Sequence, residues 1–259
     1  MIIKVLYEDS NILAIDKPSG ILVHPAPEQT QPGTGPDPKT IIDIFKKKYP
    51  KIEIVHRLDK ETSGVMLLAK NPKAHEFLKK QFVNREVKKT YLAIVSGFVK
   101  NDYGIINKPI GRSPSDFRRH LAGRGVRGEL REAITEYKVL KRFQAKTSEI
   151  FPRFTLPRIR GGTYATKKFQ KSLPAKFTYL EISPKTGRTH QIRVHMKYLN
   201  HPVACDSLYN PNGSCPENLS RLALHAKSIE FKNLKGKIVK VESPLPLEFK
   251  KVVKTMYQK

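Results

Sequence analysis

The feature that most constrains this chain is a polar stretch of nine residues, 56–64, set between two short apolar runs. The runs at 52–55 and 65–69 have the length and the aliphatic character of buried strands. The stretch between them, HRLDKETSG, is too rich in charged and hydroxyl side chains to lie in a hydrophobic core. A polar loop held between two rigid strands presents its side chains to a cleft, so we expect a functional site here.

Asp59 is the natural reactive group of this loop. A carboxylate can act as a base or as a nucleophile, and Arg57, two positions earlier, can keep it ionised. The alternative is a salt-bridged turn in which Asp59 or Thr62 satisfies nearby backbone amides. The spacing of these residues does not by itself decide between the two interpretations.

The charge of the chain restricts the class of partner. Its 49 lysines and arginines against 23 acidic residues give a formal net charge of +26, far more than solubility requires. This excess predicts a polyanionic partner, and nucleic acid is the first candidate because basic side chains displace counterions from phosphates. No basic amphipathic helix stands out and no apolar stretch approaches the ~20 residues of a membrane span, so we expect no membrane association.

The N-terminus and the cysteines predict a reducing compartment. Acidic Glu8 and Asp9 appear early and no small-residue cleavage site follows, so no secretory signal is visible and we expect a cytoplasmic protein. Cys205 and Cys215 lack the short spacing of a zinc knuckle, and no role is predicted for them.

The pattern of apolar residues predicts an α+β fold with a mixed, mostly antiparallel sheet. Strands outnumber helices and do not alternate strictly with them, which argues against a doubly wound fold. Besides the two runs beside the polar loop, strands are expected at 5–7, 12–15, 91–95, 133–140, 177–182, 222–231 and 238–241. Helices are expected after Thr40, Asn71 and Thr189, which can each cap a first turn, and over 247–256.

Two stretches concentrate the basic charge. Residues 112–131 hold six arginines and residues 140–176 hold ten basic side chains, with aromatic residues in both. They are typical of flexible arms that follow a phosphate backbone and stack rings on bases, although a merely solvated surface is the alternative. The segment 25–38, with five prolines and two glycines, is expected to be a loop.

Two patterns that suggest a cofactor or a metal lack their structural context. GRGVRG at 123–128 has the glycine spacing of a dinucleotide-binding turn, but no apolar strand precedes it. His190 and His195 do not share a helical face, and Arg188 and Arg193 would repel a cation. A metal-dependent nuclease would also need several clustered carboxylates, and the sequence shows no such cluster. We therefore expect neither a cofactor nor a metal.

A second polar segment is KTGRTHQIRVHM at 185–196. Gly187 makes a turn, and the residues after it form a helix with an apolar stripe. Arg188 lies at the start of this helix and Arg193 lies off the stripe. One of these arginines can bind phosphate while the other enters the cleft.

With both polar segments in view, the chain resembles the RluA family of RNA pseudouridine synthases. The resemblance continues through DKPSGILVHP at 16–25, KKTYLAIVSG at 88–97, GELREAITEYKVL at 128–140 and RLALHA at 221–226. It implies the pseudouridine synthase catalytic fold, a long sheet flanked by helices and loops around a basic cleft. It also implies an isomerase that converts specific uridines of structured RNA, ribosomal or transfer, to pseudouridine without a cofactor.

The resemblance implies the catalytic residues as well. Asp59 matches the aspartate that attacks the uridine, so that the base detaches, rotates and rejoins through C5. Tyr91 matches the tyrosine that stacks on the target uracil, and Arg193 matches the arginine that pairs with the aspartate. An ionised aspartate needs such a cationic partner.

Substrate-binding residues follow from the same motifs. Arg57 matches the position that helps to open the RNA and fills the space left by the flipped base, and Leu224 is expected to form a hydrophobic wall. His56, Arg188 and His190 are expected to contact the substrate. A uridine inside folded RNA has to be flipped out before an enzyme can reach it.

The chain also departs from many members of this family. The catalytic pattern begins at residue 1, so we expect a single catalytic domain over 1–259, without a separate N-terminal RNA-binding domain, that acts as a monomer. The segments 25–38 and 148–172 look longer than usual, which leaves the target RNA open. An RNA-binding protein without catalytic activity is the second function considered, but it would need the basic stretches and not the three catalytic residues together.

Overall fold

The computed structural model describes residues 3–24, 40–148 and 174–257. The strands of the main sheet are β1 (Val5–Glu8), β2 (Ile12–Lys17), β3 (Glu53–Ile54), β4 (Ser63–Ala69), β5 (Lys88–Ser96), β6 (Tyr103–Asn107), β10 (Ile134–Ala145), β12 (Ala175–Pro184), β14 (Leu224–Lys232) and β15 (Ile238–Glu242). Two smaller sheets are built from β7 (Ile110–Arg112), β8 (His120–Ala122) and β9 (Arg127–Arg131), and from β11 (Thr147–Ser148) and β13 (Cys215–Pro216). The helices are α1 (Ile41–Lys46), α2 (Pro72–Val83), α3 (Gln191–Tyr198) and α4 (Leu247–Met256).

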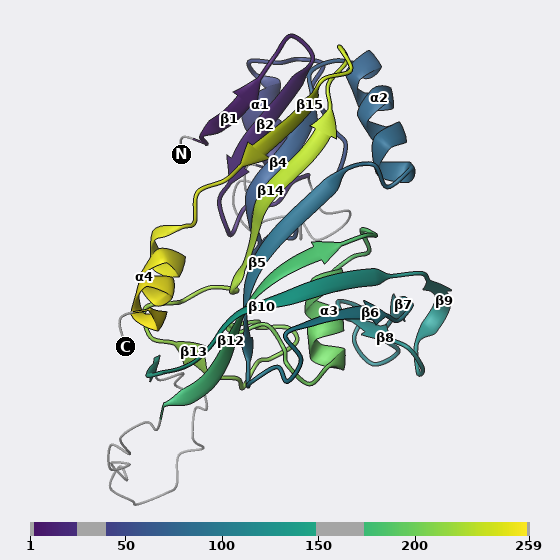
Figure 1. Ribbon diagram of the computed structural model, residues 1–259. Helices are drawn as coiled ribbons and strands as arrows, with labels where there is room; N and C mark the ends of the chain where they lie inside the picture. Colours follow the sequence, from purple (N-terminus) through teal and green to yellow (C-terminus); the bar gives the residue numbers. More distant parts are fainter. Residues whose placement is uncertain (1–2, 25–39, 149–173, 258–259) are drawn as a thin grey trace, which may run out of the picture.

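The main sheet has ten strands and runs through the whole molecule (Figure 1). Its path is β1–β2–β4–β14–β5–β12–β10–β6, with β15 beside β14 and β3 beside β4. The pairing of β14 with β4 is parallel, and the other pairings in this sheet are antiparallel. The predicted α+β fold with a mixed, mostly antiparallel sheet is confirmed.

Two hydrophobic cores lie along this sheet, one in the upper and one in the lower half of Figure 1. The upper core forms around β2 and β4 and includes Ile15 and Leu67, both fully buried. The lower core forms around β5 and β12 and includes Phe177. β14 contributes to both, and Tyr91 of β5 packs against both. The two halves of the molecule therefore meet at the middle of β5 and β14.

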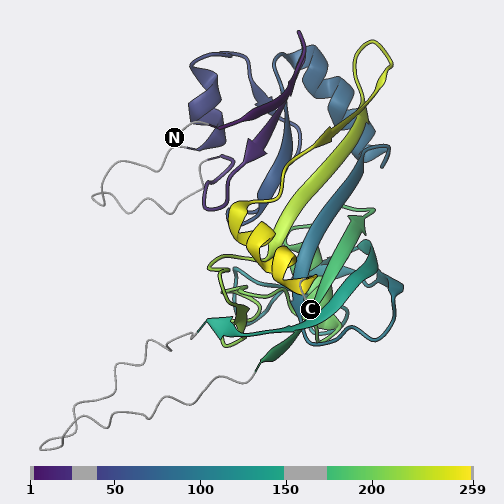
Figure 2. The same cartoon turned by 60° about the vertical axis from the view of Figure 1, so that its left-hand side comes forward.

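Helix α4 covers part of the sheet near this junction (Figure 2). Its fully buried Phe249 lies with its ring 6.3 Å from that of Tyr179 in β12 and 6.5 Å from that of His225 in β14. The helix spans 247–256, as predicted.

Two predicted helix starts are confirmed by their caps. Thr40 and Asp43 form a capping box at α1: the threonine hydroxyl accepts the Asp43 N–H at 3.3 Å, and the carboxylate accepts the Thr40 N–H at 2.9 Å. At α2 the Asn71 side chain accepts the Ala74 N–H at 2.9 Å, and Pro72 occupies the first turn.

The predicted cap of α3 is wrong. The helix begins after His190, which has a left-handed backbone with a φ of 55° and makes no side-chain capping bond. Instead the Gln191 carboxamide accepts the Arg188 N–H at 3.0 Å. The turn is therefore closed by a side chain from inside the helix, and Thr189 stays exposed.

The basic stretch 112–131 is not a flexible arm. It contributes to the three-stranded sheet β8–β7–β9. Gly123 and Gly125 lie in the turn between β8 and β9 and Gly128 lies at the start of β9, with φ angles of 81°, 79° and 77°. Positive φ is readily available to glycine, so the glycines of GRGVRG serve a tight turn. Most of 148–172 and all of 25–38 lie outside the described residues.

The two cysteines, for which no role was predicted, lie next to each other. Their Cα atoms are 5.1 Å apart and their sulfur atoms are in contact. Their separation of ten residues in the sequence gives no sign of this contact, because it depends on how the loop after α3 returns to β13.

Candidate active site

The loop between β3 and β4 carries Asp59 to the junction of the two cores. Leu58 before it and Thr62 after it are buried, and the Asp59 side chain is 18% exposed. The Thr62 N–H donates to the Asp59 carbonyl at 3.1 Å, which closes a turn. The loop is thus anchored at both ends while the carboxylate itself remains accessible.

A buried lysine supports this loop from below. The ammonium of Lys17, at the end of β2, is fully buried and donates to three carbonyl oxygens, those of Pro18 and Lys60 at 3.0 Å and of Thr62 at 2.9 Å. Its pKa is lowered to about 8, mainly by burial. The negative charge of Asp59 opposes this shift, and the positive charge of Arg221 adds to it. The Lys17 ammonium therefore ties β2 to the loop that holds Asp59.

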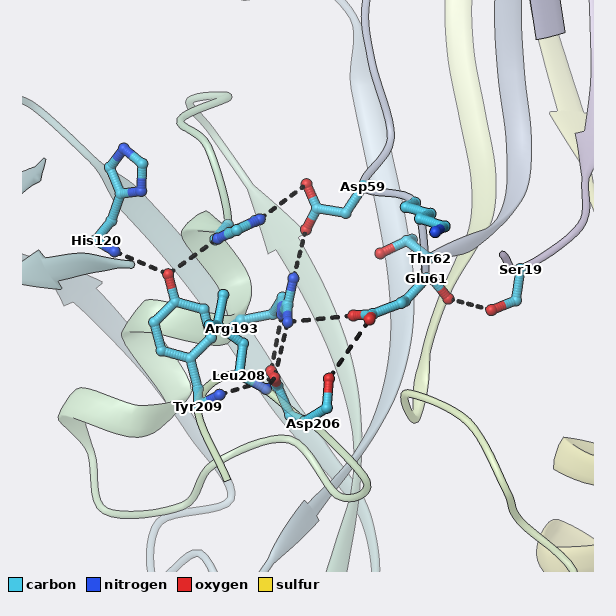
Figure 3. A network of polar contacts seen from close by, with 12 residues as sticks. Ser19, Asp59, Glu61, Thr62, His120, Arg193, Asp206, Leu208 and Tyr209 are labelled. Carbon is cyan, nitrogen blue, oxygen red and sulfur yellow. Dashed lines mark hydrogen bonds and ion pairs between the residues drawn. The ribbon is translucent and has the colours of Figure 1, made fainter. Parts of the chain in front are cut away.

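The guanidinium of Arg193 lies among three carboxylates (Figure 3). Its Nη1 is 3.5 Å from Asp59 Oδ2, and its Nη2 is 3.3 Å from Glu61 Oε2. Its Nε and Nη2 each donate to Asp206 at 2.8 Å. Burial opposes the charge of Arg193, but the hydrogen bonds and charge of Asp206, with smaller contributions from Asp59 and Glu61, raise the pKa of the guanidinium, which stays charged.

His190 and Tyr209 line the other side of the Asp59 carboxylate. His190 Nε2 is 3.9 Å from Asp59 Oδ1, and its Nδ1 is hydrogen-bonded to the Tyr209 hydroxyl at 3.0 Å. Burial lowers the pKa of His190 although Asp59 opposes the shift, so the ring is neutral at pH 7. The Tyr209 ring also lies under the Arg193 guanidinium, 5.1 Å from its centroid.

One cavity of about 580 Å³ contains this site. Its lining includes all eight residues predicted from the sequence: His56, Arg57, Asp59, Tyr91, Arg188, His190, Arg193 and Leu224. They come from the loop before β4, from β5, from the start of α3 and from β14. The structure therefore brings together two motifs that are more than 120 residues apart in the chain.

Tyr91 and Leu224 form part of the apolar wall of this cavity. Tyr91 lies in β5 and Leu224 opens the neighbouring strand β14, where it is 3% exposed. Burial, and then the charge of Asp59, raise the pKa of the Tyr91 hydroxyl, which stays protonated. An aromatic ring and an aliphatic side chain at this place suit a flat, uncharged base.

The sequence suggested that Arg57 keeps Asp59 ionised. In the structure the two side chains are not paired. Among the described residues Asp59 pairs with the Arg193 guanidinium and lies 3.9 Å from the neutral His190 ring, whereas Arg57 is exposed. Arg57 remains a lining residue of the cavity.

His56 holds the loop in place. Its Nε2 accepts the Leu67 N–H at 2.9 Å, and its ring stacks on Phe82 with centroids 4.8 Å apart. Burial, with a smaller effect from the charge of Lys89, lowers the pKa of His56 to about 3, so the ring is neutral. Arg188, at the rim, donates through Nε to the Glu132 carbonyl at 2.8 Å.

Four residues of the site were missed from the sequence: Lys17, Lys89, Asp206 and Tyr209. Asp206 and Tyr209 lie in an irregular segment after α3, where no periodicity marks a buried side chain. Lys89 lines the cavity and donates to the Thr186 carbonyl at 3.2 Å, and burial lowers its pKa to about 8. Lysines in β-strands are usually exposed, so neither the buried Lys17 nor the half-buried Lys89 stands out in the sequence.

In residues 3–24, 40–148 and 174–257, no group of three or more histidine, cysteine, aspartate or glutamate side chains is arranged to hold a metal ion. Within the same ranges, every helix is too short or too polar to cross a membrane.

Comparisons with known proteins agree with this geometry. An uncharacterised RNA pseudouridine synthase of Bacillus subtilis is 34% identical over 266 residues, which cover 99% of this chain and 73% of the relative. An uncharacterised RNA pseudouridine synthase of Aquifex aeolicus is 39% identical, covering 85% of this chain and 60% of the relative. The ribosomal large subunit pseudouridine synthase D of Xanthomonas campestris is 33% identical, covering 98% and 69%.

Solved structures have the same fold. Human RNA pseudouridylate synthase domain containing 1 superposes with a TM-score of 0.70 at 20% identity, covering 100% of this chain and 96% of that one. Human RNA pseudouridylate synthase domain containing 4 gives a TM-score of 0.65 at 24% identity, covering 97% and 92%. The family model described as RNA pseudouridylate synthase matches residues 11–198 and confirms the resemblance seen in the motifs. Since that match spans most of the chain, the protein belongs to the RNA pseudouridylate synthase family and is an RNA-modifying isomerase.

Proposed function

We propose that this protein converts uridines of ribosomal RNA to pseudouridine, with Asp59 as the nucleophile. The observation that carries the proposal is the Asp59 carboxylate, 18% exposed in a cavity of about 580 Å³, with the Arg193 guanidinium 3.5 Å away. A cavity of this size is in the range that holds a small ligand. The guanidinium places a positive charge beside this carboxylate, and a carboxylate oxygen can act as a nucleophile.

The reaction is an isomerisation: the link between uracil and ribose moves from N1 to C5, and the composition of the RNA does not change. The Asp59 carboxylate attacks ribose C1′ of the flipped nucleotide and forms a bond to it, while the bond between C1′ and uracil N1 breaks. The freed uracil rotates within the cavity, where the Tyr91 ring and Leu224 hold it without strong directional contacts. A new bond forms between C5 and C1′ as the bond between C1′ and the Asp59 carboxylate breaks; C5 then loses its proton to solvent, and N1 takes up a proton from solvent.

Ribosomal RNA is the substrate class that the relatives favour. Relatives in Xanthomonas campestris, Nitrosomonas europaea and Neisseria meningitidis, at 33–34% identity, are named ribosomal large subunit pseudouridine synthase D. The net charge of +26 also suits a large, folded polyanion. We also propose that the enzyme acts in the cytoplasm and as a monomer.

A binding protein without catalytic activity is not favoured. A protein that only binds RNA has no need of a carboxylate in its binding cavity. The negative charge of Asp59 repels phosphate and therefore weakens binding. The presence of Asp59 in spite of this unfavourable effect on RNA binding is explained if Asp59 takes part in the reaction of the bound nucleotide.

Mapping of pseudouridine in total RNA tests the proposal. Cells that lack the protein should lose one or more pseudouridines in large-subunit ribosomal RNA. The wild-type gene should restore them, and a gene with Asp59→Asn should not. Losses confined to transfer RNA would overturn the substrate, and restoration by Asp59→Asn would overturn the role of Asp59.

A further inference from the structure

A row of three basic residues crosses the small sheet beside the catalytic cavity. Arg112 in β7 is the register partner of His120 in β8 and of Arg127 in β9. Residues directly opposite each other in antiparallel strands project from the same face of a sheet. Two guanidinium groups and one imidazole therefore lie side by side. The like charges of the two guanidinium groups repel each other, which disfavours this arrangement.

This row lines a second cavity of about 630 Å³. Gly187, Arg188 and Thr189 line both this cavity and the one that holds Asp59, so the two cavities share a rim. Phe117, whose side chain is 78% exposed, also lines the second cavity. An exposed ring beside a basic surface is typical of sites that bind single-stranded nucleic acid.

The charges of Arg112 and Arg127 are not compensated within the described part of the chain. The neighbouring arginines are paired: Arg118 and Arg119 with Asp116, and Arg131 with Glu129, at 2.9–3.4 Å. Glu129 is the one carboxylate among the residues that line the second cavity. No ion pair between described residues involves Arg112 or Arg127, so their charges are available to an external anion.

His120 connects the row to the catalytic site. Its backbone N–H donates to the Tyr209 hydroxyl at 2.9 Å, and its ring lies edge-on to that of His190 with centroids 6.0 Å apart. Its Nδ1 is buried without a hydrogen-bond partner among the described residues. A buried polar atom without a partner is uncommon, and its packing leaves a hydrogen-bonding atom of this ring unused.

We infer that Arg112, His120 and Arg127 form a subsite for a phosphodiester of the substrate RNA that adjoins the flipped uridine, with Phe117 stacking on a neighbouring base. The inference rests on the proposed function, because the subsite shares its rim with the cavity for the uridine. Guanidinium forks match the oxygens of a phosphate, and a bound phosphate relieves the repulsion between the two arginines. The subsite would set which RNA segment reaches Asp59.

A double variant tests the subsite. Arg112→Gln combined with Arg127→Gln should raise the KM for a synthetic RNA stem-loop with one loop uridine by about tenfold, with a much smaller change in kcat. Arg118→Gln, an exposed arginine of the same segment that lies outside both cavities, is the matched control and should leave KM unchanged. Equal effects of the two variants would overturn the subsite.

Neutral backbone linkages locate the phosphate. Stem-loops that carry a single methylphosphonate at successive positions around the uridine should bind the wild-type protein weakly when one particular linkage is neutral. That penalty should disappear in the double variant, since the arginines that contacted the phosphate are gone. A penalty spread evenly over all positions, or one that persists in the double variant, would show diffuse attraction and overturn the inference.

Phe117 provides an independent readout. Phe117→Ala should weaken binding of the intact stem-loop and have no further effect on a stem-loop that is abasic at the stacked position. Additive losses would show that the ring does not stack on that base. All these binding measurements are independent of turnover: if the wild-type protein shows the position-dependent penalty and yet converts no uridine, the proposed function fails while the subsite stands.

Discussion

Arg193 and Asp206 are joined by two hydrogen bonds of 2.8 Å, from Nε to Oδ2 and from Nη2 to Oδ1. Asp206 is fully buried and also accepts the backbone N–H groups of Leu208 and Tyr209 at 3.0 and 2.9 Å. A bidentate pair fixes the plane of the guanidinium, and in this plane Nη1 is directed at Asp59. Asp206 is thus the residue that positions Arg193.

Asp206→Asn should destabilise the protein and lower turnover. The substitution leaves the buried guanidinium with a weakened partner, a change that costs about 3–5 kcal/mol in other buried pairs. Urea unfolding measures the loss. Asp102→Asn is the control, because Asp102 pairs with Arg142 at 2.7 Å on the surface and its side chain is 75% exposed. Exposed pairs contribute about 0–1 kcal/mol, so equal losses in the two variants would contradict the positioning role.

Asp59→Asn should abolish pseudouridine formation while RNA affinity stays within a few-fold of the wild type. Asparagine keeps the shape of aspartate but lacks the anionic oxygen of a nucleophile. Most of the affinity comes from the basic surface, and removal of a negative charge favours RNA. Lys60→Ala, an exposed neighbour, should retain substantial turnover. If Asp59→Asn converts uridine near the wild-type rate, the residue belongs only to a structural turn.

Lys17→Met should lower both the free energy of unfolding and kcat. Three carbonyl oxygens lose their shared donor, and each buried unsatisfied polar group costs about 1–3 kcal/mol. The loop that carries Asp59 also loses its link to β2. Lys4→Met, at an exposed position next to β1, is the control. Denaturant unfolding and single-turnover rates measure the two effects, and a variant as stable and as active as Lys4→Met would refute the supporting role of Lys17.

His225 should make the protein sensitive to acid. Burial lowers the pKa of His225 to about 4, whereas the same side chain in the unfolded chain titrates near ~6.5. Between these values the unfolded chain binds more protons than the folded one, so the free energy of unfolding falls as the pH is lowered from about 6.5 to about 4. The contribution of this residue is about 3 kcal/mol when fully developed. The contribution of His225 to the free energy of unfolding is complete above about pH 6.5, the pKa of the residue in the unfolded chain.

Urea unfolding over this pH range tests the expectation. Replacement of His225 by Gln removes the titrating group, so its unfolding free energy should depend less on pH than that of the wild type. His75→Gln, on the surface of α2, serves for comparison. Identical pH profiles for the wild type and His225→Gln would show that His225 does not carry the effect.

Activity should survive chelation. The described residues contain no cluster of ligands for a metal ion, and the chemistry assigned to Asp59 requires only side chains. We expect EDTA to leave turnover unchanged on an RNA that stays folded without magnesium. A loss of activity that added zinc or magnesium restores on such an RNA would refute the expectation.

Local signals in the sequence were sufficient for much of the fold. Thr40 and Asn71 mark helix starts by chemistry that acts within three residues, and Val65 to Ala69 have the continuous apolar character of a strand buried on both faces. The sheet β8–β7–β9 escaped detection because all five residues of β9 are exposed, so no alternation of apolar and polar side chains reveals it.

The candidate site could be predicted only in part, for a similar reason. Asp59 and Arg193 lie in polar motifs whose composition excludes a core position, so both stand out in the sequence. Asp206 and Lys17 do not, because their roles depend on partners far away in the chain: Lys17 donates to the carbonyl of Thr62, 45 residues later. Contacts of this kind follow from the path of the sheet and leave no local pattern.

The junction of the two cores has a consequence for how the enzyme loses activity. Asp59 belongs to the loop packed in the upper core, Arg193 to the helix packed on the lower one, and Tyr91 touches both. A partial opening that separates the two halves would therefore disconnect the Asp59 carboxylate from the Arg193 guanidinium while each half keeps its own packing. Activity therefore depends on the two halves of the sheet staying packed together. On heating or in denaturant, the loss of activity should precede the loss of secondary structure.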